Sequence, residues 1–382
     1  MKAVVFHGVG DIRLDDVSDP VLQAPTDALI ELTASAICGT DLHMVRGTMP
    51  GMRPGTILGH EGVGVVTEVG QDVNNLRPGD RVVIPSTIAC GYCSYCRSGY
   101  HAQCDNANPN GMRAGTAFFG GPQTSGPFHG LQAEYARIPF ANIGAIKLPD
   151  EISDDQAILM SDIFPTGYFG AQLAEIRRGD TVVVFGCGPV GQFAIVSAHL
   201  LGASRILAVD HVPSRLEAAQ AQGAEAIDFN REDPVQAILR LTGGIGADRA
   251  IDAVGIDAQR RHADGDGSAG QPSLWQPGDG PSEVLKWSVE ALAKAGTLSI
   301  IGVYPEAHET FPIGKAMNKN LTLKMGNCNH RAILPELVDL VRAGVIDPAE
   351  VLTQTEPLTG ALQAYEAFDQ RQPGWMKVKL EP

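Results

Sequence analysis

Four cysteines lie close together in the first third of the chain. They are spaced Cys90-x-x-Cys93-x-x-Cys96, and Cys104 follows after a short gap. The residues between them are mainly Gly, Ser and Tyr without an apolar period, so the segment is expected to be a loop. Four thiolates at this spacing suit a tetrahedral zinc ion with no open coordination position. The spacing therefore predicts a structural zinc site, with an iron–sulfur cluster as the alternative.

Further residues of metal-ligand type lie outside this loop. Cys38 and His60 each stand where a β-type segment meets a turn, and Glu61 follows directly. A thiolate and an imidazole could bind one zinc ion. On these residues alone, a buried cysteine and a hydrogen-bonded turn histidine explain the pattern equally well. Asp162 lies in the apolar segment SDIFPTGY, where a carboxylate must be solvated, cap a helix or pair with a cation.

The segment from Thr181 to Asp210 has the pattern of a strand, a turn, a helix and a second strand. Its turn reads GCGPVG. Gly186 suits the tight turn, Gly188 lets backbone N–H groups approach a pyrophosphate, and Gly191 lets the helix pack on the strand. The helix N-terminus would then face the phosphates. This pattern predicts a dinucleotide site, whereas a glycine-rich turn without a ligand is the alternative.

Two residues beyond this turn bear on which dinucleotide binds. Asp210 is placed where a carboxylate accepts hydrogen bonds from the adenosine ribose and repels a 2′-phosphate. Its presence favours NAD over NADP. Arg215 opposes that preference, because a nearby cation can accept a 2′-phosphate.

Length, charge and cysteine use exclude several classes of protein. A chain of 382 residues exceeds what one hydrophobic core usually supports, so two domains are expected. A net charge of −15 without a Lys/Arg cluster argues against a nucleic-acid partner. The N-terminal sequence does not resemble a signal peptide, and no apolar run is long enough to span a bilayer. We therefore expect no membrane partner and a cytoplasmic location, where cysteines serve as metal ligands rather than in disulfides.

The order of predicted elements suggests how these residues are positioned. Short β-type runs predict a β-rich domain over residues 1–160, and an α/β rhythm predicts a doubly wound sheet over 161–326. Residues 257–282 are rich in Gly, Asp, Pro and Ser and are expected to form a long inserted loop. A helix is predicted over 283–296. The tail, 327–382, is too short for a core of its own and is expected to return to the first domain, leaving a cleft between the two.

Together these motifs resemble the zinc-dependent medium-chain alcohol dehydrogenases over almost the whole chain. The motifs are CGTDLH from Cys38, GHEGVGVVTEVG, the four-cysteine loop, SDIFPTGY and GCGPVG. The resemblance implies a GroES-like catalytic domain with a Rossmann coenzyme domain, two Zn²⁺ per chain and NAD. It implies a catalytic zinc bound by Cys38, His60 and Asp162. Asp162 replaces the cysteine of many members, and with the insertion at 257–282 it resembles the formaldehyde dehydrogenase branch.

The resemblance also implies roles for residues around the zinc and the cofactor. Thr40 and His43 would pass on the released proton, and Glu61 would approach the zinc during ligand exchange. Zinc would act as a Lewis acid toward an alcohol or aldehyde-hydrate oxygen. Gly39 stands where many members have an arginine that contacts the pyrophosphate, so Arg331 or Lys377 is a candidate for that contact. The expected cofactor contacts are Thr166, Gly186, Gly188, Pro189, Val190, Gly191, Asp210 and Arg215.

The expected reaction is hydride transfer between NAD and a small alcohol or aldehyde hydrate. Formaldehyde or its glutathione adduct is one candidate substrate. The alternative within the family is a secondary-alcohol, polyol or threonine-type dehydrogenase. The alternative of another class is a nucleotide-binding protein without catalysis. The resemblance implies a homotetramer, with a dimer as the second possibility.

Overall fold

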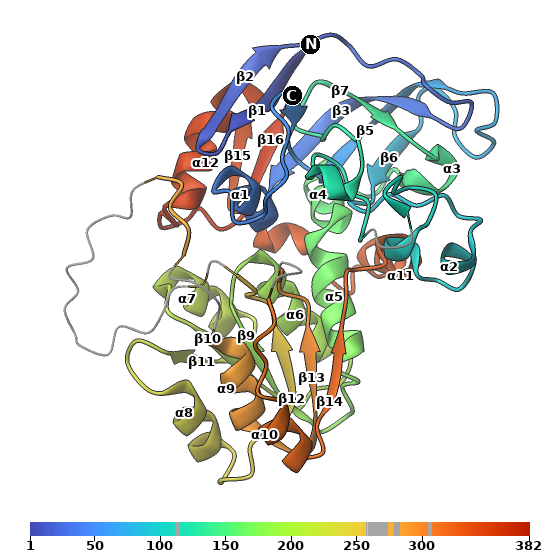
Figure 1. The fold of residues 1–382 in the computed structure, drawn as a ribbon. Coiled ribbons are helices and arrows are strands. Elements are labelled where there is room, and N and C mark those ends of the chain that lie inside the picture. The colour runs from blue at the N-terminus through green and yellow to red at the C-terminus, as the bar shows by residue number, and fades with distance from the viewer. Residues whose placement is uncertain (112–114, 257, 259–273, 279–282, 305–307) are drawn as a thin grey trace. The chain divides into compact units, whose positions relative to one another are not determined.

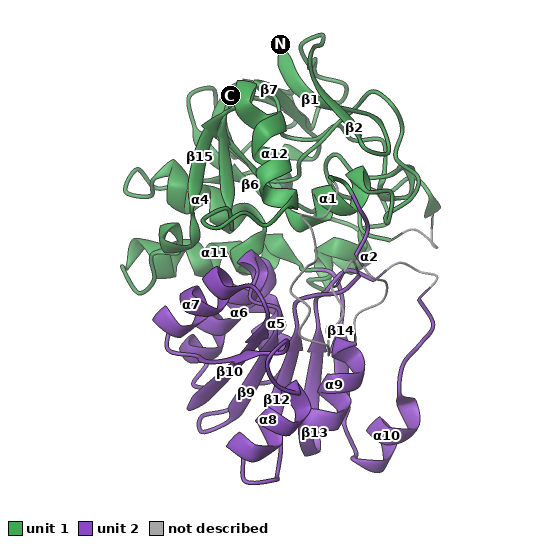
Figure 2. Ribbon diagram, turned by 90° about the vertical axis from the view of Figure 1, so that its left-hand side faces the viewer, with its two compact units in different colours: residues 1–165, 273–275, 328–382 green, residues 166–272, 276–327 purple. Residues whose placement is uncertain are grey.

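The computed structural model describes residues 1–111, 115–256, 258, 274–278, 283–304 and 308–382. Most of the insertion predicted at 257–282 lies outside these residues. The chain forms two compact units, shown in different colours in Figure 2. Unit 1 comprises Met1–Pro165, Ser273–Trp275 and Cys328–Pro382, and unit 2 comprises Thr166–Pro272 and Gln276–Asn327.

Unit 1 is built on a seven-stranded sheet whose central strands are β3 (Ala28–Ile37) and β5 (Gly62–Val69). These two strands pair antiparallel, so the end of β3 lies beside the start of β5. The strand β16 (Val378–Glu381), at the C-terminal end of the chain, pairs with the other edge of β3 (Figure 1). The remaining strands of this sheet are β6 (Arg81–Ile84), β7 (Tyr135–Ile138), β8 (Ile146–Lys147) and β15 (Gln354–Pro357).

A smaller sheet and several helices complete unit 1. The sheet has the order β2-β1-β4, from β1 (Lys2–Gly8), β2 (Asp11–Asp16) and β4 (Thr56–Ile57). The α-helices are α1 (Gly39–Val45), α2 (Ser94–Arg97), α3 (Ala141–Gly144), α4 (Asp154–Ser161), α11 (His330–Arg342) and α12 (Ala361–Asp369). The short 3₁₀ turns are η1 (His101–Gln103), η3 (Gln123–Ser125), η4 (Pro348–Val351) and η5 (Leu358–Gly360).

Unit 2 contains a six-stranded parallel sheet of order β11-β10-β9-β12-β13-β14. Reading the strands in chain order gives 3-2-1-4-5-6, the arrangement of a doubly wound dinucleotide-binding fold. The strands are β9 (Thr181–Phe185), β10 (Arg205–Asp210), β11 (Glu225–Asp228), β12 (Ala247–Asp252), β13 (Leu292–Ile300) and β14 (Thr322–Met325). The predicted fold class is confirmed.

Helices cover both faces of this sheet because its central strand is apolar on both sides. Val182 and Val184 of β9 pack among side chains of α5 (Ile163–Leu173), α6 (Pro189–Leu200) and α7 (Pro213–Ala221). On the opposite face, residues 183 and 185 of β9 pack with those of α8 (Pro234–Leu241), α9 (Val284–Ala291) and α10 (Ile313–Asn318). Such continuous apolar strands are typical of a sheet buried on both faces.

One predicted element ends earlier than expected. The helix predicted over 283–296 stops at Ala291, and β13 begins at the next residue. The Lys319 ammonium donates to the backbone carbonyls of Val289, Glu290 and Leu292, which satisfies the helix end. Ala295 then adopts a left-handed backbone with φ 59°. The distant lysine overrides the local helix propensity of the alanine-rich segment.

Within the described ranges, every helix is too short or too polar to cross a membrane.

Candidate active site and metal centres

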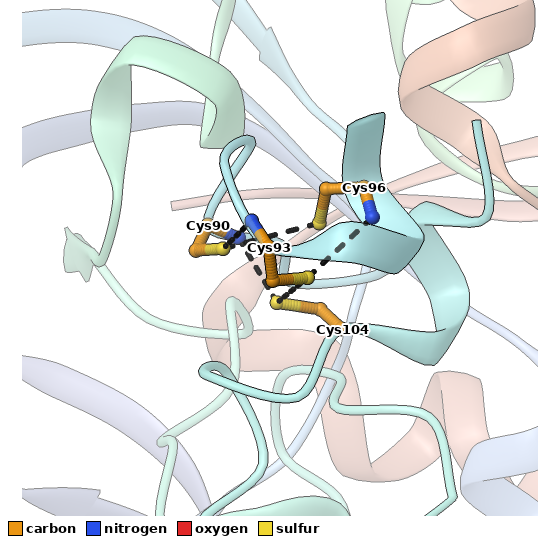
Figure 3. Close-up of side chains that lie close together, drawn as sticks. All are labelled: Cys90, Cys93, Cys96 and Cys104. Carbon is orange, nitrogen blue, oxygen red and sulfur yellow. Dashed lines mark hydrogen bonds between the residues drawn. The ribbon is translucent and has the colours of Figure 1, made fainter. Parts of the chain in front are cut away.

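The four predicted thiolate ligands converge in the loop that contains α2. Cys90, Cys93, Cys96 and Cys104 direct their sulfurs toward one another (Figure 3), and all four lie within 4.8 Å of each other. The Sγ atoms of Cys90 and Cys96 are 4.0 Å apart, as are those of Cys93 and Cys104. Tetrahedral zinc with bonds of about 2.3 Å would place pairs of sulfurs about 3.8 Å apart. The residues fit one such ion, whereas a cluster of several irons would hold its sulfurs farther apart.

Backbone amides point at these sulfurs. Cys93 donates its N–H to Cys90 Sγ at 3.3 Å, and Cys96 donates to Cys93 Sγ at 3.4 Å. Cys104 Sγ accepts the N–H groups of Cys90 and Ala107. Burial would raise the pKa of Cys93, but backbone hydrogen bonds lower it to about 7. The loop therefore favours a thiolate at Cys93 before any metal binds.

A second cluster lies at one end of the large sheet of unit 1. Cys38 directly follows β3, and His60 and Glu61 directly precede β5. Asp162 ends α4. These four side chains are buried, and each offers a donor atom within 4.8 Å of the others. The structure thus brings together the three residues that the resemblance assigned to the catalytic zinc, together with Glu61.

The positions of these side chains follow from the antiparallel pairing of β3 with β5 and from the hydrogen bonds of Ser161. Ser35 near the end of β3 is opposite Gly62 at the start of β5, which places Cys38 beside His60. Ser161, the last residue of α4, accepts the N–H of Gly62 at 3.0 Å and donates to the carbonyl of Ile84 in β6. These bonds fix the end of α4, and with it Asp162, against the same edge.

Asp162 directs one carboxylate oxygen toward both Cys38 and His60. Its Oδ2 is 3.7 Å from Cys38 Sγ and 3.4 Å from His60 Nε2. Burial alone would raise the pKa of Asp162, but hydrogen bonds from His330 and His60 hold it well below its ordinary value of 3.8. The side chain is therefore an ionised carboxylate, able to bind a cation.

His60 is supported from its other nitrogen. His60 Nδ1 lies 3.3 Å from Asp41 Oδ1, and the other oxygen of Asp41 accepts the Cys38 N–H at 2.9 Å. Gln132 Nε2 also reaches that oxygen, while Gln132 Oε1 accepts from the Tyr365 hydroxyl. Carboxylate-to-histidine contacts of this kind orient metal-ligating histidines. Gly59 has φ +88°, and a Cβ at this position would lie 2.4 Å from the Gln132 side chain, so the glycine preceding His60 is required by packing.

Glu61 forms a fully buried ion pair with Lys377, whose ammonium lies 2.5 Å from Glu61 Oε1. Lys377 also donates to the backbone carbonyl of Ile37. Lys377 was one of two candidates for the pyrophosphate contact, and its buried, already paired ammonium rules it out, which leaves Arg331 as the candidate. Burial raises the pKa of Glu61 to about 7 despite this partner. Glu61 Oε2 is buried without a hydrogen-bond partner among the described residues, so this oxygen is available to bind a cation.

The donor set suits zinc. A thiol, an imidazole and two carboxylates are buried within bonding reach of one point, with Lys377 against Glu61 and His330 against Asp162. Burial raises the pKa of the Cys38 thiol, whereas a bound dication would favour the thiolate. Mixed sulfur, nitrogen and oxygen ligands are accepted by Zn²⁺.

The two residues expected to relay a proton lie on α1, immediately after Cys38. Thr40 is half-buried and His43 is buried. The Thr48 hydroxyl lies 3.4 Å from His43 Nδ1. Their role in proton transfer stays a prediction.

The dinucleotide motif forms the turn from β9 into α6. Gly186 has φ +86°, and a Cβ at Gly191 would lie 1.8 Å from the Gly186 carbonyl oxygen. Gly188 precedes the first residue of α6, Pro189, and a Cβ there would meet only Arg215, at 3.7 Å. The turn therefore closes tightly at its two outer glycines and leaves space at the middle one, as a pyrophosphate site requires. Val190 is the next residue of α6, and Thr166 lies on α5.

Asp210 ends β10, beside this turn. Its carboxylate accepts backbone N–H groups from Cys187 at 2.7 Å, His211 at 2.7 Å and Val212 at 3.0 Å. Burial opposes ionisation, but Arg215, His211 and these hydrogen bonds lower the pKa of Asp210. Asp210 is thus a fixed negative charge, and it also ties the glycine turn to the next strand.

Sequence reasoning missed His330 and Thr87, which lie next to the second cluster. His330 Nε2 lies 2.8 Å from Asp162 Oδ1, and His330 Nδ1 lies 3.2 Å from the Thr87 hydroxyl. Neither residue belongs to one of the motifs, and 168 positions separate His330 from Asp162. Spacing along the chain carried no signal for this contact.

Comparison with known proteins shows which family the chain resembles. The model of the alcohol dehydrogenase GroES-like domain matches residues 24–150, and that of the zinc-binding dehydrogenase matches 189–263. An uncharacterised zinc-type alcohol dehydrogenase-like protein of Bacillus subtilis (strain 168) is 38% identical over 386 residues, covering 100% of both chains. A glutathione-independent formaldehyde dehydrogenase of Pseudomonas aeruginosa (strain LESB58) is 36% identical over 316 residues, covering 79% of this chain and 75% of that protein.

Among solved structures, the alcohol dehydrogenase TADH from Thermus sp. ATN1 has a TM-score of 0.85 and 35% sequence identity. The match covers 100% of this chain and 99% of that one. The chain therefore belongs to the zinc-dependent alcohol dehydrogenase family. It is an oxidoreductase whose cofactors are zinc and a nicotinamide dinucleotide, as predicted.

Proposed function

We propose that this protein transfers hydride between NAD and a small alcohol or aldehyde hydrate, using a zinc ion bound by Cys38, His60 and Asp162. The observation that carries the proposal is the convergence of these three buried donors at the end of β3 and the start of β5. A zinc ion there supplies Lewis acidity, which lowers the pKa of a substrate hydroxyl toward neutrality. Three protein ligands leave a fourth position for substrate.

The surrounding residues would orient the ligands and move the proton. Asp41 lies 3.3 Å from the ring of His60, and Lys377 holds Glu61 beside the other donors. Glu61 is thereby placed to approach the metal while a substrate or water ligand is exchanged. We assign proton transfer to Thr40 and His43 on α1, because a hydroxyl and an imidazole can each accept and donate a proton.

We further propose that NAD is preferred over NADP. Asp210 carries a negative charge at the end of β10, where a ribose hydroxyl is accepted and a 2′-phosphate repelled. Arg215 lies close to Gly188 and is the residue that would oppose this preference. The pyrophosphate would bind at Gly188 and the N-terminus of α6.

Formaldehyde is the substrate we propose first. Asp162 in SDIFPTGY and the similarity to the formaldehyde dehydrogenase of Pseudomonas aeruginosa support this choice. Secondary alcohols, polyols and threonine are the alternatives, since they undergo the same chemistry. A homotetramer and a cytoplasmic location also stay predictions, to be tested by light scattering and cell fractionation.

The test is a substrate panel followed at the NADH absorbance band. Zinc-loaded protein is mixed with formaldehyde, primary and secondary alcohols, a polyol and threonine, each with NAD or NADP and with or without glutathione. The proposal predicts NADH formation from formaldehyde that does not need glutathione. Faster turnover of a secondary alcohol would move the protein to the alternative class. The absence of turnover with every substrate would favour a nucleotide-binding protein without catalysis.

A further inference from the structure

His330 connects the C-terminal part of the chain to the candidate catalytic site. It is the first residue of α11, and its side chain is buried against Asp162 and Thr87, which are themselves buried. Cys328, two residues earlier, also interacts with the imidazole. The ring is thus enclosed by polar partners, and its orientation is determined by them.

The chemistry of these partners fixes what each ring nitrogen does. The Asp162 carboxylate can only accept hydrogen bonds, so His330 Nε2 carries the proton that it donates to Oδ1 at 2.8 Å. His330 Nδ1 lies 3.2 Å from the Thr87 hydroxyl, which can donate to this nitrogen in a neutral ring or accept from it in a protonated one. Thr87 therefore holds the ring in the orientation that directs Nε2 to Asp162.

This contact divides the two oxygens of Asp162 between different tasks. Oδ1 is bound to His330, whereas Oδ2 faces His60 Nε2 at 3.4 Å and Cys38 Sγ at 3.7 Å. A carboxylate can bind a metal ion through one oxygen or through both. With Oδ1 engaged by the histidine, Oδ2 is the oxygen directed to the metal. Binding through both oxygens would use the position that a substrate oxygen needs.

His330 is itself held by the four-cysteine loop. Asn329, its neighbour, accepts the backbone N–H of Ala102 through Oδ1 at 3.0 Å. Ala102 lies in η1, between Cys96 and Cys104. Thr87 stands three residues before Cys90 and bridges to Phe118. The four-cysteine loop therefore holds the residue next to His330, and the segment that leads into this loop holds the His330 ring.

We propose that His330 is a positioning residue that restricts Asp162 to binding the catalytic metal through Oδ2 alone, and so preserves the open position for substrate. This inference rests on the proposed metal site. It assigns a function to α11, and it gives the four-cysteine loop a task beyond local stability.

The test compares two amides that place their N–H donor differently. Gln at position 330 can put its Nε2 where the histidine Nε2 stands, whereas Asn reaches only the Nδ1 position. We expect H330N to weaken metal binding at the catalytic site by about 10- to 100-fold, the usual effect of losing a partner of a metal ligand. We expect H330Q to remain within a few-fold of the wild type. Metal affinity is measured by chelator competition, with the four-cysteine site as an internal control.

The coordination itself is read from the visible absorption of the Co²⁺-substituted protein. In H330N the second carboxylate oxygen can bind the metal, so the band intensity at the catalytic site should fall as the coordination number rises. H330Q should retain the wild-type spectrum. In zinc-loaded enzyme, kcat should fall in H330N more than KM changes, because the open position is lost rather than the pocket.

Thr87→Val provides a second route to the same result if H330N folds poorly. Valine keeps the shape of threonine but removes the hydroxyl, so it should change affinity and spectrum in the same direction with a smaller amplitude. Equal effects of H330N and H330Q, or spectra unchanged in both H330N and Thr87→Val, would overturn the proposal.

Failure of the proposed function looks different. If wild-type protein binds metal only at the four-cysteine site, both the function and this inference are wrong. If it binds two metals and oxidises an alcohol while H330N behaves like the wild type, only the role of His330 is wrong.

Discussion

The reactivity of the candidate site depends on which buried groups are ionised. Asp162 is held as a carboxylate by two histidines, although burial opposes its charge. Glu61 keeps a buried cation as its partner, yet its pKa is still raised to about 7. A substitution that removes one group therefore changes the charge of the others, and the effects should not be additive.

At the residue scale, Cys38→Ala should abolish turnover and leave nicotinamide dinucleotide binding intact. The sulfur belongs to the unit 1 cluster, whereas the glycine turn belongs to unit 2. A bound metal contributes several kcal/mol to the transition state, so the rate should fall by about 10³-fold or more. Metal content, NADH formation and cofactor titration are measured together. Turnover near the wild-type level would remove Cys38 from the metal shell.

Asp210→Ala should relax the preference for NAD. Removing the carboxylate removes the ribose acceptor and the repulsion of a 2′-phosphate, while Arg215 remains. The ratio of kcat/KM for NAD to that for NADP should fall by about tenfold or more, which corresponds to about 1.4 kcal/mol. Asp210→Glu is the matched control because it keeps the charge. An unchanged ratio in Asp210→Ala would contradict the ribose assignment.

At the scale of elements, antiparallel pairing of β3 and β5 and the end of α4 assemble donors that are far apart in sequence. Cys38 and Asp162 are separated by 124 positions. The four-cysteine loop is different, because its ligands are close in sequence and backbone amides of the loop donate to their sulfurs. The site of Cys38, His60 and Asp162 therefore requires the folded unit, whereas the four-cysteine site can form locally.

Cys93→Ser should lower stability and remove one zinc without directly removing a group from the chemical step. Loss of a thiolate opens the four-sulfur shell, and binding energy at such sites is folding energy. Zinc content and the thermal melting temperature are the measurements. Tyr92→Phe, at an exposed position of the same loop, is the control and should retain both zincs. A normal melting curve with one zinc lost would argue against a structural role.

The glycine turn offers a matched pair of substitutions. Gly191→Ala would put a methyl group 1.8 Å from the Gly186 carbonyl oxygen, so β9 and α6 must separate at a cost of about 1–3 kcal/mol or more. Gly188→Ala meets no such obstacle, and its methyl group would instead occupy the space for the pyrophosphate. We expect Gly188→Ala to melt normally but to bind NAD about tenfold more weakly or worse, by at least 1.4 kcal/mol. Tight binding in Gly188→Ala would place the phosphates elsewhere.

At the scale of the whole molecule, unit 1 contains both metal-ligand clusters, and unit 2 contains the dinucleotide turn. This separation means that metal loss and cofactor loss can be measured independently. It also makes Cys38→Ala and Gly188→Ala complementary, since each should impair one function and spare the other.

The sequence predicted the features whose residues lie close together. Cys90 to Cys104 and the glycines after β9 have local spacings dictated by metal geometry and by turn geometry, and the sheet followed from the apolar strands. The second cluster was different. Cys38 and His60 alone were ambiguous, and Asp162 was assigned by resemblance because no spacing rule connects it to them.

The remaining features required the fold. Lys377 was, with Arg331, a candidate for the cofactor contact, but strand β16 pairs beside β3 and buries Lys377 against Glu61. His330 reaches Asp162 only because α11 packs against α4. The end of α9 depends on Lys319, which follows it by more than twenty residues. Pairings across such distances leave no periodic pattern in the chain.

The most direct test of the central claim is diffraction from crystals of zinc-loaded protein, recorded on both sides of the zinc absorption edge. We predict two anomalous peaks per chain, one among the four cysteines and one about 2.0–2.3 Å from Cys38 Sγ, His60 Nε2 and Asp162 Oδ2. A peak at the four cysteines alone, with none between these three residues, would contradict the account.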